Sequence, residues 1–168
     1  MSEDGEKVWL YVYDLTNGMA ATFSPMLLGR QIEALYHTGV VVGGVEYFFG
    51  GGVQRCIAGQ TPFGNPLKRV ELGVTHIPKD LREELLAELS QRFQPQDYNL
   101  ISKNCNHFSS SLVELLTGSP IPDEYVNQAQ SILSSPLGQM LLPIMEQMEQ
   151  RYGNVTATGF QQQQQPGR

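Results

Sequence analysis

The chain has 168 residues, of which 40% are hydrophobic and 17% charged, and its formal net charge is −6. A chain of this length can bury most of its apolar surface in a single domain. The 11 basic residues form no cluster, so we do not expect nucleic acid as a partner. The first residues are polar and acidic, and no apolar run is long enough to cross a bilayer. We therefore expect neither a secretory signal peptide nor membrane insertion.

Short strands are expected along the first half of the chain, because glycine (17 residues) and proline (10 residues) are frequent. Residues 8–14 alternate aliphatic and aromatic side chains, which is typical of a strand buried on both faces. Further β-branched and aromatic runs, divided by glycines, predict strands over 38–43, 45–49, 53–57 and 68–72.

Helices are expected before, between and after these strands. Ser24-Pro25 predicts a helix start, with Ser as the N-cap and Pro at the first helical position. This helix should pass Gly29, because apolar residues continue at helical spacing, namely Leu28, Ile32 and Leu35. Pro78 predicts the start of a second helix that ends near Gln94-Pro95. Its apolar face consists of leucines, namely Leu81, Leu85, Leu86 and Leu89.

A third helix is expected from Asn104 to Thr117, with Gly118 as its C-terminal cap. Four residues form its apolar stripe: Phe108, Leu112, Leu115 and Leu116. Residues 121–151 show a less regular helical pattern, interrupted by Pro136 and Pro143. Strands, an inserted helix and late helices together predict an α+β domain.

We place this domain at residues 7–150. Residues 153–168 are rich in Gly, Thr and Gln, and they have too few apolar groups to offset the entropy lost on ordering. We therefore expect a disordered, Gln-rich tail.

Cys105 is the candidate nucleophile. A polar, Asn-rich loop leads into the predicted third helix, and Asn104 is a natural N-cap that makes Cys105 the first helical residue. Unpaired backbone N–H groups at a helix start give a positive potential, which lowers the pKa of a nearby thiol. The resulting thiolate is the nucleophilic form.

A thiolate nucleophile also needs a base, and the chain has three histidines. His107 lies two residues after Cys105, so the two side chains point to different sides of the helix. His76 precedes Pro78 at an expected surface turn. His37 lies where a helix gives way to a strand, which is a rigid mount, and it is the favoured base.

Other interpretations of these residues stay open. Cys105 could be a buried structural thiol, and His37 could be a half-buried histidine with satisfied hydrogen bonds. Cys56 should belong to the core, although the sequence leaves a disulfide between Cys56 and Cys105 open. Zinc normally needs four ligands with closely spaced pairs, and Cys105-Asn106-His107 is the only close pair, so we expect no metal and no other cofactor.

Several blocks of the sequence together resemble the PPPDE family, and especially its desumoylating isopeptidases of the DeSI type. These blocks are residues 10–15, 35–41, 46–50, 98–109, 116–122 and 135–139. The resemblance covers most of residues 8–145. Its most specific parts are His37-Thr38 followed by Val40-Val41, and the block from Asn104 to Ser109.

The resemblance implies a circularly permuted papain-like fold, in which a small antiparallel sheet or barrel packs with helices. His37 and Cys105 match the catalytic pair of the family. The resemblance also implies a homodimer, action on SUMO- or ubiquitin-conjugated proteins, and residence in cytoplasm and nucleus. Tyr36 stands where relatives often carry Trp, which would alter the wall beside His37. Asn104 and Tyr36 are the candidates for positioning the substrate or the oxyanion.

The sequence therefore predicts a cysteine isopeptidase that hydrolyses the bond between a ubiquitin-like modifier and a lysine, through a thioester on Cys105. Two alternatives remain. One is a thioesterase that removes fatty acyl groups (an S-depalmitoylase) with the same dyad. The other is a non-catalytic interaction module that uses the Leu- and Met-rich segment 132–148.

Overall fold

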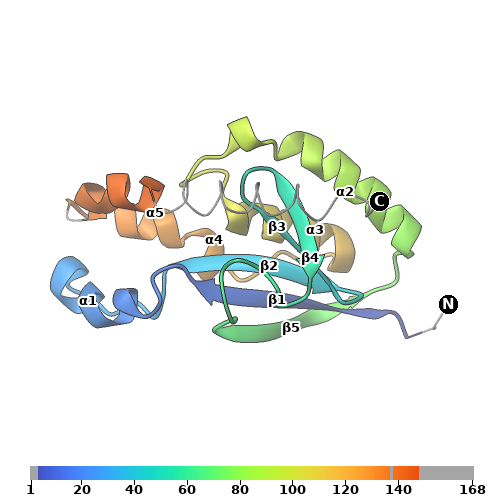
Figure 1. Ribbon diagram of the computed structural model, residues 1–168, viewed down its shortest axis with the longest axis horizontal. Coiled ribbons are helices and arrows are strands. Elements are labelled where there is room, and N and C mark those ends of the chain that lie inside the picture. Colours follow the sequence, from blue (N-terminus) through green and yellow to red (C-terminus); the bar gives the residue numbers. More distant parts are fainter. Residues whose placement is uncertain (1–3, 137, 148–168) are drawn as a thin grey trace, which may run out of the picture.

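A five-stranded antiparallel sheet, in the order β4-β3-β2-β1-β5, is the centre of the described part of the molecule (Figure 1). The computed structural model describes residues 4–136 and 138–147. The strands are β1 (Glu6–Asp14), β2 (Tyr36–Val42), β3 (Val45–Phe49), β4 (Val53–Ile57) and β5 (Lys68–Thr75). All the expected strands are present, and the mixed α/β architecture is confirmed.

The helices lie around this sheet (Figure 1). They are α1 (Met19–Leu28), α2 (Lys79–Arg92), α3 (Cys105–Thr117), α4 (Asp123–Val126) and α5 (Gln128–Leu133), with a short 3-10 helix, η1 (Pro95–Asp97). Residues 138–147 are also helical, so Pro143 does not interrupt the helical pattern there. Helices α1 and α5 lie at one end of the molecule, and α2 lies toward the opposite end. Among the described residues, no helix has both the length and the apolar character to span a bilayer.

The first helix begins earlier than the sequence predicts. The expected start at Ser24-Pro25 is wrong, because α1 begins at Met19 and Pro25 lies inside it. The start is fixed by the preceding turn, in which Asp14 accepts hydrogen bonds from the backbone N–H groups of Thr16 (2.9 Å) and Gly18 (2.7 Å). Proline cannot donate to the carbonyl four residues earlier, so the Gln31 side chain donates to that carbonyl, of Ala21, at 2.7 Å.

Gly29 ends this helix, whereas the sequence pattern predicts that the helix continues past it. Its backbone is left-handed (φ 69°), a conformation that glycine adopts without a steric penalty, and its N–H bonds the carbonyl of Pro25 at 3.0 Å. Leu28, Ile32 and Leu35, which the sequence places at helical spacing, nevertheless share one packing site. The three side chains pack against one small cluster of buried residues that includes Leu100 and Met145.

The main core lies between one face of the sheet and α3. Val40 and Val42 of β2 pack in one buried cluster with Phe108 and Leu112 of α3. Helix α3 and its caps, Asn104 and Gly118, are confirmed. Two expected core positions are wrong, because the side chains of Leu115 and Leu81 are 41% and 45% exposed.

On α2 a charged residue fills part of the buried side that leucines were expected to occupy. Arg82 is buried, donates to the carbonyl of Ile77 at 3.0 Å and pairs with Glu6 at 3.2 Å. The hydrogen bond and the ion pair together make burial of a guanidinium tolerable. The predicted tail, residues 153–168, lies outside the described residues, as do residues 148–150 of the predicted domain.

Phe108 offers a direct test of this core. Replacing Phe108, which is 0% exposed, by Ala should lower the free energy of unfolding by about 3–5 kcal/mol, because the cavity cannot be refilled. Leu115→Ala, on the exposed side of the same helix, should cost less than about 1 kcal/mol. Urea denaturation followed by circular dichroism measures both. Equal losses in the two variants would contradict the assigned packing.

Candidate active site

The start of α3 has the geometry that the sequence predicts for a nucleophile. Cys105 is the first residue of the helix and is 3% exposed. The Asn104 side-chain oxygen accepts hydrogen bonds from the backbone N–H groups of Asn106 (2.8 Å) and His107 (3.2 Å), which fixes the first turn. Neither Cys56 nor Cys105 is disulfide-bonded, so the disulfide left open by the sequence is not formed, and Cys56 is half-buried rather than part of the core.

Helix α3 begins beside β2, at the point where the neighbouring strand stops pairing. The β2–β3 ladder ends at the pair Val40–Tyr47. Beyond it, side chains of α3 donate to the carbonyls of β2. Asn106 Nδ2 bonds the Tyr36 carbonyl at 3.2 Å, and Ser109 Oγ bonds the Thr38 carbonyl at 3.2 Å. The helix start thus takes the place of a strand along this part of β2.

These contacts bring the residues around His37 close to the thiol. The Thr38 hydroxyl donates to Asn106 Oδ1 at 2.7 Å, and Cys105 Sγ lies 3.7 Å from the same oxygen. His37 lies between Tyr36 and Thr38, the two residues that Asn106 binds. The two sequence-predicted residues of the dyad, 68 positions apart in the chain, therefore belong to adjoining elements that are joined by buried hydrogen bonds.

The His37 ring lies in an aromatic enclosure. It stacks on Phe63 with ring centroids 3.7 Å apart, and it contacts Tyr13 and Phe48 with centroids 5.8 and 5.9 Å away. The residue is 3% exposed, and within the described chain its Nε2 atom is buried without a hydrogen-bond partner. Burial lowers the pKa of His37 to about 3, so the ring is neutral near pH 7 and can accept a proton.

The two other predicted site residues are engaged in structural contacts. Asn104 Nδ2 donates to the carbonyl of Leu100 at 2.8 Å, while its oxygen caps α3. The Tyr36 ring packs edge-on against Tyr125, and its hydroxyl donates to Glu33 at 2.9 Å. Burial raises the pKa of Tyr36 to about 12. Their part in positioning a substrate or an oxyanion stays a prediction.

The remaining histidines are placed elsewhere. His76 is exposed, as expected. His107 is half-buried rather than fully at the surface, because its Nδ1 accepts a hydrogen bond from the backbone N–H of Asn104 at 3.1 Å. Among the described residues, no group of three His, Cys, Asp or Glu side chains could hold a metal ion.

Sequence reasoning missed the groups that surround His37. Phe63 comes from the loop between β4 and β5, and nothing in the sequence indicated that this loop covers the histidine. Glu46 was a visible signal, because it is a carboxylate inside a strand of buried apolar residues, Val45–Phe49. It faces the same side of the sheet as His37.

Comparison with known proteins gives consistent matches. Residues 6–146 match the family described as "PPPDE putative peptidase domain". The chain is 37% identical to desumoylating isopeptidase 1 of Xenopus laevis (92% of this chain, 94% of the relative) and 40% identical to that of Homo sapiens (84% and 86%). It is 34% identical to the DeSI-like protein sdu1 of Schizosaccharomyces pombe (75% and 65%).

The buried, neutral His37 predicts a pH dependence of stability. Its pKa is about 3 in the folded protein and about 6.5 in an unfolded chain, so between these values only the unfolded state binds the proton. The contribution of His37 to the free energy of unfolding is therefore at its full value above pH 6.5, and it decreases as the pH is lowered toward 3. The slope reaches about 1.4 kcal/mol per pH unit.

Urea denaturation at several pH values tests this expectation. His37→Phe, which keeps a flat ring against Phe63, should lose less stability on acidification than the wild-type protein. His76→Gln, at an exposed histidine, is the matched control and should keep the wild-type slope. A His37→Phe protein with an unchanged slope would contradict the buried, neutral ring.

Proposed function

Since the chain belongs to the PPPDE peptidase family, we propose that it is a cysteine isopeptidase that releases SUMO from substrate lysines. The substrate class follows the names of its relatives. The observation that carries the proposal is the junction of α3 with β2, where Asn106 Oδ1 contacts both the Cys105 thiol (3.7 Å) and the Thr38 hydroxyl (2.7 Å). A thiol at a helix start, beside a strand that bears a histidine, is an arrangement suited to nucleophilic catalysis.

The order of these elements supports a circularly permuted papain-like fold. The histidine strand, β2, precedes the cysteine helix, α3, in the chain, and both are parts of one rigid unit. A catalytic pair on a helix and a strand is held more firmly than a pair on loops.

In the first chemical step, His37 takes the proton of the Cys105 thiol, and the sulfur attacks the carbonyl of the C-terminal glycine of the modifier. The positive end of α3 stabilises the developing negative charge, through backbone N–H groups that include that of Cys105. Asn104 contributes indirectly in this proposal, because its side chain fixes the turn.

In the second step, the imidazolium of His37 gives its proton to the lysine amine as the carbon–nitrogen bond breaks. Water, deprotonated by His37, then hydrolyses the thioester and regenerates the thiol. The ring is neutral before the reaction, since burial depresses its pKa to about 3. A thiolate beside it favours the charged ring, so the ion pair forms when Cys105 gives its proton to His37.

Cleavage of SUMO joined through its C-terminal Gly-Gly to a fluorogenic amine tests this function. Cys105→Ser and His37→Ala should each lower kcat/KM by at least about 1000-fold, because they remove the nucleophile and the base. Cys56→Ser, at the other cysteine, should retain wild-type activity. Parallel assays use the ubiquitin conjugate and a fluorogenic acyl thioester. Activity only on the thioester would indicate a thioesterase, and no cleavage of any probe would indicate a binding module.

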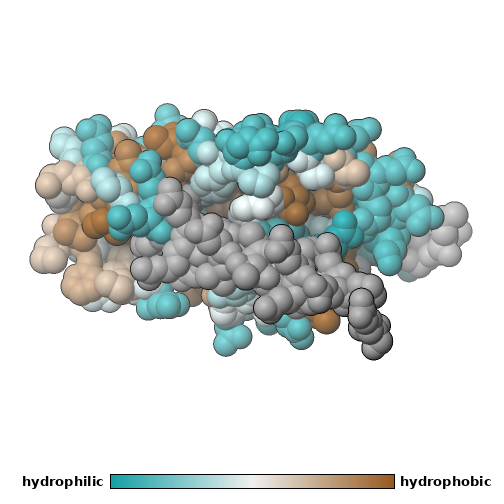
Figure 2. All heavy atoms as spheres, turned by 45° about the horizontal axis from the view of Figure 1, so that its top comes forward, coloured by the Kyte–Doolittle hydropathy of each residue, from teal (hydrophilic) through white to brown (hydrophobic). Residues whose placement is uncertain are grey.

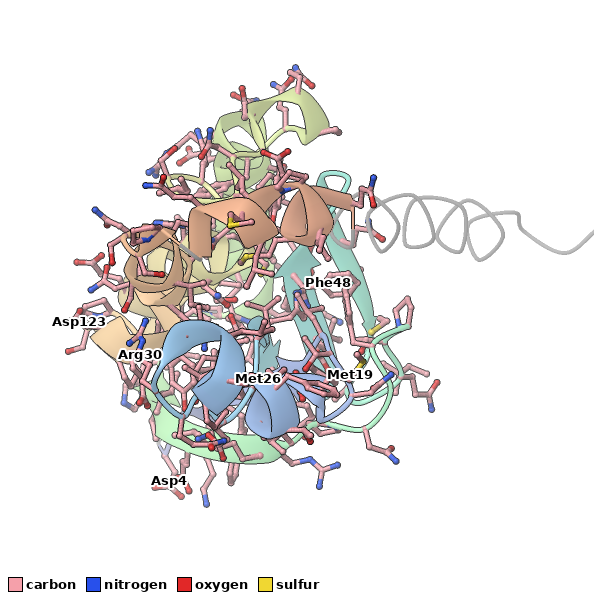
Figure 3. The ribbon with its side chains drawn as sticks, turned by 90° about the vertical axis from the view of Figure 1, so that its left-hand side faces the viewer. Asp4, Met19, Met26, Arg30, Phe48 and Asp123 are labelled. Carbon is pink, nitrogen blue, oxygen red and sulfur yellow. The ribbon has the colours of Figure 1, made fainter. Side chains whose placement is uncertain are left out.

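We also propose that the chain forms a homodimer through the exposed face of α1. This helix carries no charged residue, and Met19, Phe23 and Met26 are 60%, 43% and 73% exposed. Figure 2 shows apolar residues gathered at this end of the molecule, and Figure 3 shows Met19 and Met26 on the outward side of α1. An uncharged apolar face suits self-association because a second copy would present the same surface.

The oligomeric state of a variant tests this interface. Met26→Lys should convert a two-chain species into a single chain in light scattering coupled to size-exclusion chromatography, because the new charge would be buried at the interface. Leu81→Lys changes an equally apolar, 45% exposed residue on α2 and should leave the dimer intact. A Met26→Lys protein that remains a dimer would exclude α1 as the interface.

A further inference from the structure

Glu46 is a carboxylate buried in the sheet beside His37. It is 0% exposed, and a carboxylate is seldom so deeply buried unless neighbouring groups compensate for the lost water. The Tyr13 hydroxyl donates to it, lying 2.8 and 3.0 Å from its two oxygens, and the backbone N–H of Gly59 donates at 2.9 Å. None of the ion pairs in the described part of the chain includes Glu46.

The strand register puts this carboxylate on the same face of the sheet as His37. Glu46 is paired with Val41, and side chains two residues apart on a strand point the same way, so His37, Gly39 and Val41 share that face. A Cβ atom on Gly39 would lie 2.9 Å from Glu46 Cδ. Because Gly39 lacks a side chain, the Glu46 carboxyl group lies directly over β2 at Gly39. Gly39 is the residue that follows His37 on this face of the strand.

Tyr13 joins the two groups. It is paired with His37 in the β1–β2 ladder, its ring contacts the imidazole at a centroid distance of 5.8 Å, and its hydroxyl binds Glu46. Burial raises the pKa of Tyr13, so the hydroxyl keeps its proton and remains a donor to the carboxylate.

We propose that Glu46 is a positioning residue for the dyad, whose carboxylate stabilises the imidazolium that forms on His37 when the ring takes the proton of Cys105. The inference rests on the proposed function, since it concerns the same proton transfer. The proton moves from sulfur to imidazole and later to the lysine amine, while Glu46 itself exchanges none. The described groups in ring contact with His37 are Tyr13, Phe48 and Phe63, and none of them is acidic, while Nε2 of His37 itself is buried without a partner. Among the described residues of that face, Glu46 is the buried carboxylate that can balance the new charge.

Other titratable groups face this pair from the packed elements. Tyr13 lies on β1, Cys56 lies on β4, where it is paired with Glu46, and Arg69 lies on β5. Burial raises the pKa of Glu46, whereas the bonds from Gly59 and Tyr13, and the charge of Arg69, lower it. Burial also raises the pKa of Cys56 to about 11, so that thiol stays neutral near pH 7.

Glu46→Gln tests the proposal, because the amide oxygen can still accept from Gly59 and Tyr13 while the charge is lost. The rate of Cys105 alkylation by iodoacetamide is measured against pH, together with kcat/KM on the SUMO probe. We expect the pH midpoint of alkylation to rise by about one unit and kcat/KM at pH 7 to fall by about tenfold or more, with little change in KM. A purely structural role would lower stability without moving the pH midpoint.

Further variants make the outcome decisive. Glu71→Gln removes the same charge at an exposed residue paired with Lys7 and should keep both wild-type profiles. Tyr13→Phe removes the hydroxyl but keeps the ring, and it should shift the midpoint in the same direction as Glu46→Gln. Glu46→Asp keeps the charge and should retain most of the wild-type kcat/KM on the SUMO probe.

The possible results separate this inference from the function on which it rests. Unchanged pH profiles in Glu46→Gln, with Cys105→Ser and His37→Ala inactive, would overturn the role of Glu46 alone. Full activity of Cys105→Ser or His37→Ala would instead overturn the proposed dyad. If Glu46→Gln does not fold, a wild-type pH midpoint in Tyr13→Phe overturns the role of Glu46.

Discussion

The contact between the first turn of α3 and the edge of β2 is the interaction on which the candidate site depends. Where β3 stops pairing, Asn106 and Ser109 donate to the carbonyls of Tyr36 and Thr38 in place of a neighbouring strand. Buried backbone carbonyls without partners are costly, so these side chains hold the helix start in one position and register. The thiol of Cys105 is fixed beside the strand of His37 by the same bonds that satisfy that strand.

The face of the sheet away from α3 determines the chemical state of the histidine. Phe63, Phe48 and Tyr13 exclude water from the ring, which keeps the imidazole neutral. A desolvated imidazole is a weak base until a charge develops nearby. The buried carboxylate of Glu46 lies on the same face of the sheet as His37, and the start of α3 is bonded to the strand that carries His37. A proton transferred from Cys105 to His37 would therefore move between groups that are already oriented.

The apolar surface of α1 stands apart from this chemistry. The helix lacks charged residues altogether, and its exposed side carries Met19, Phe23 and Met26. It also precedes β2 in the chain and packs through Leu28 against the cluster that contains Leu100, just before the cysteine helix. A partner bound to α1 would therefore contact a helix that packs against the segment leading into α3.

The sequence alone determined the strands, the cysteine helix with its Asn104 cap, the two candidate residues and the family. These features depend on local patterns, namely alternation, capping chemistry and short motifs, which a chain shows without being folded. Tertiary structure decided three other features: the start of α1, the exposure of Leu81 and Leu115, and the enclosure of His37 by Phe63. Which groups share a face with the histidine follows from strand register and loop packing, because contacts between residues distant in the chain are decided only when the whole core is assembled.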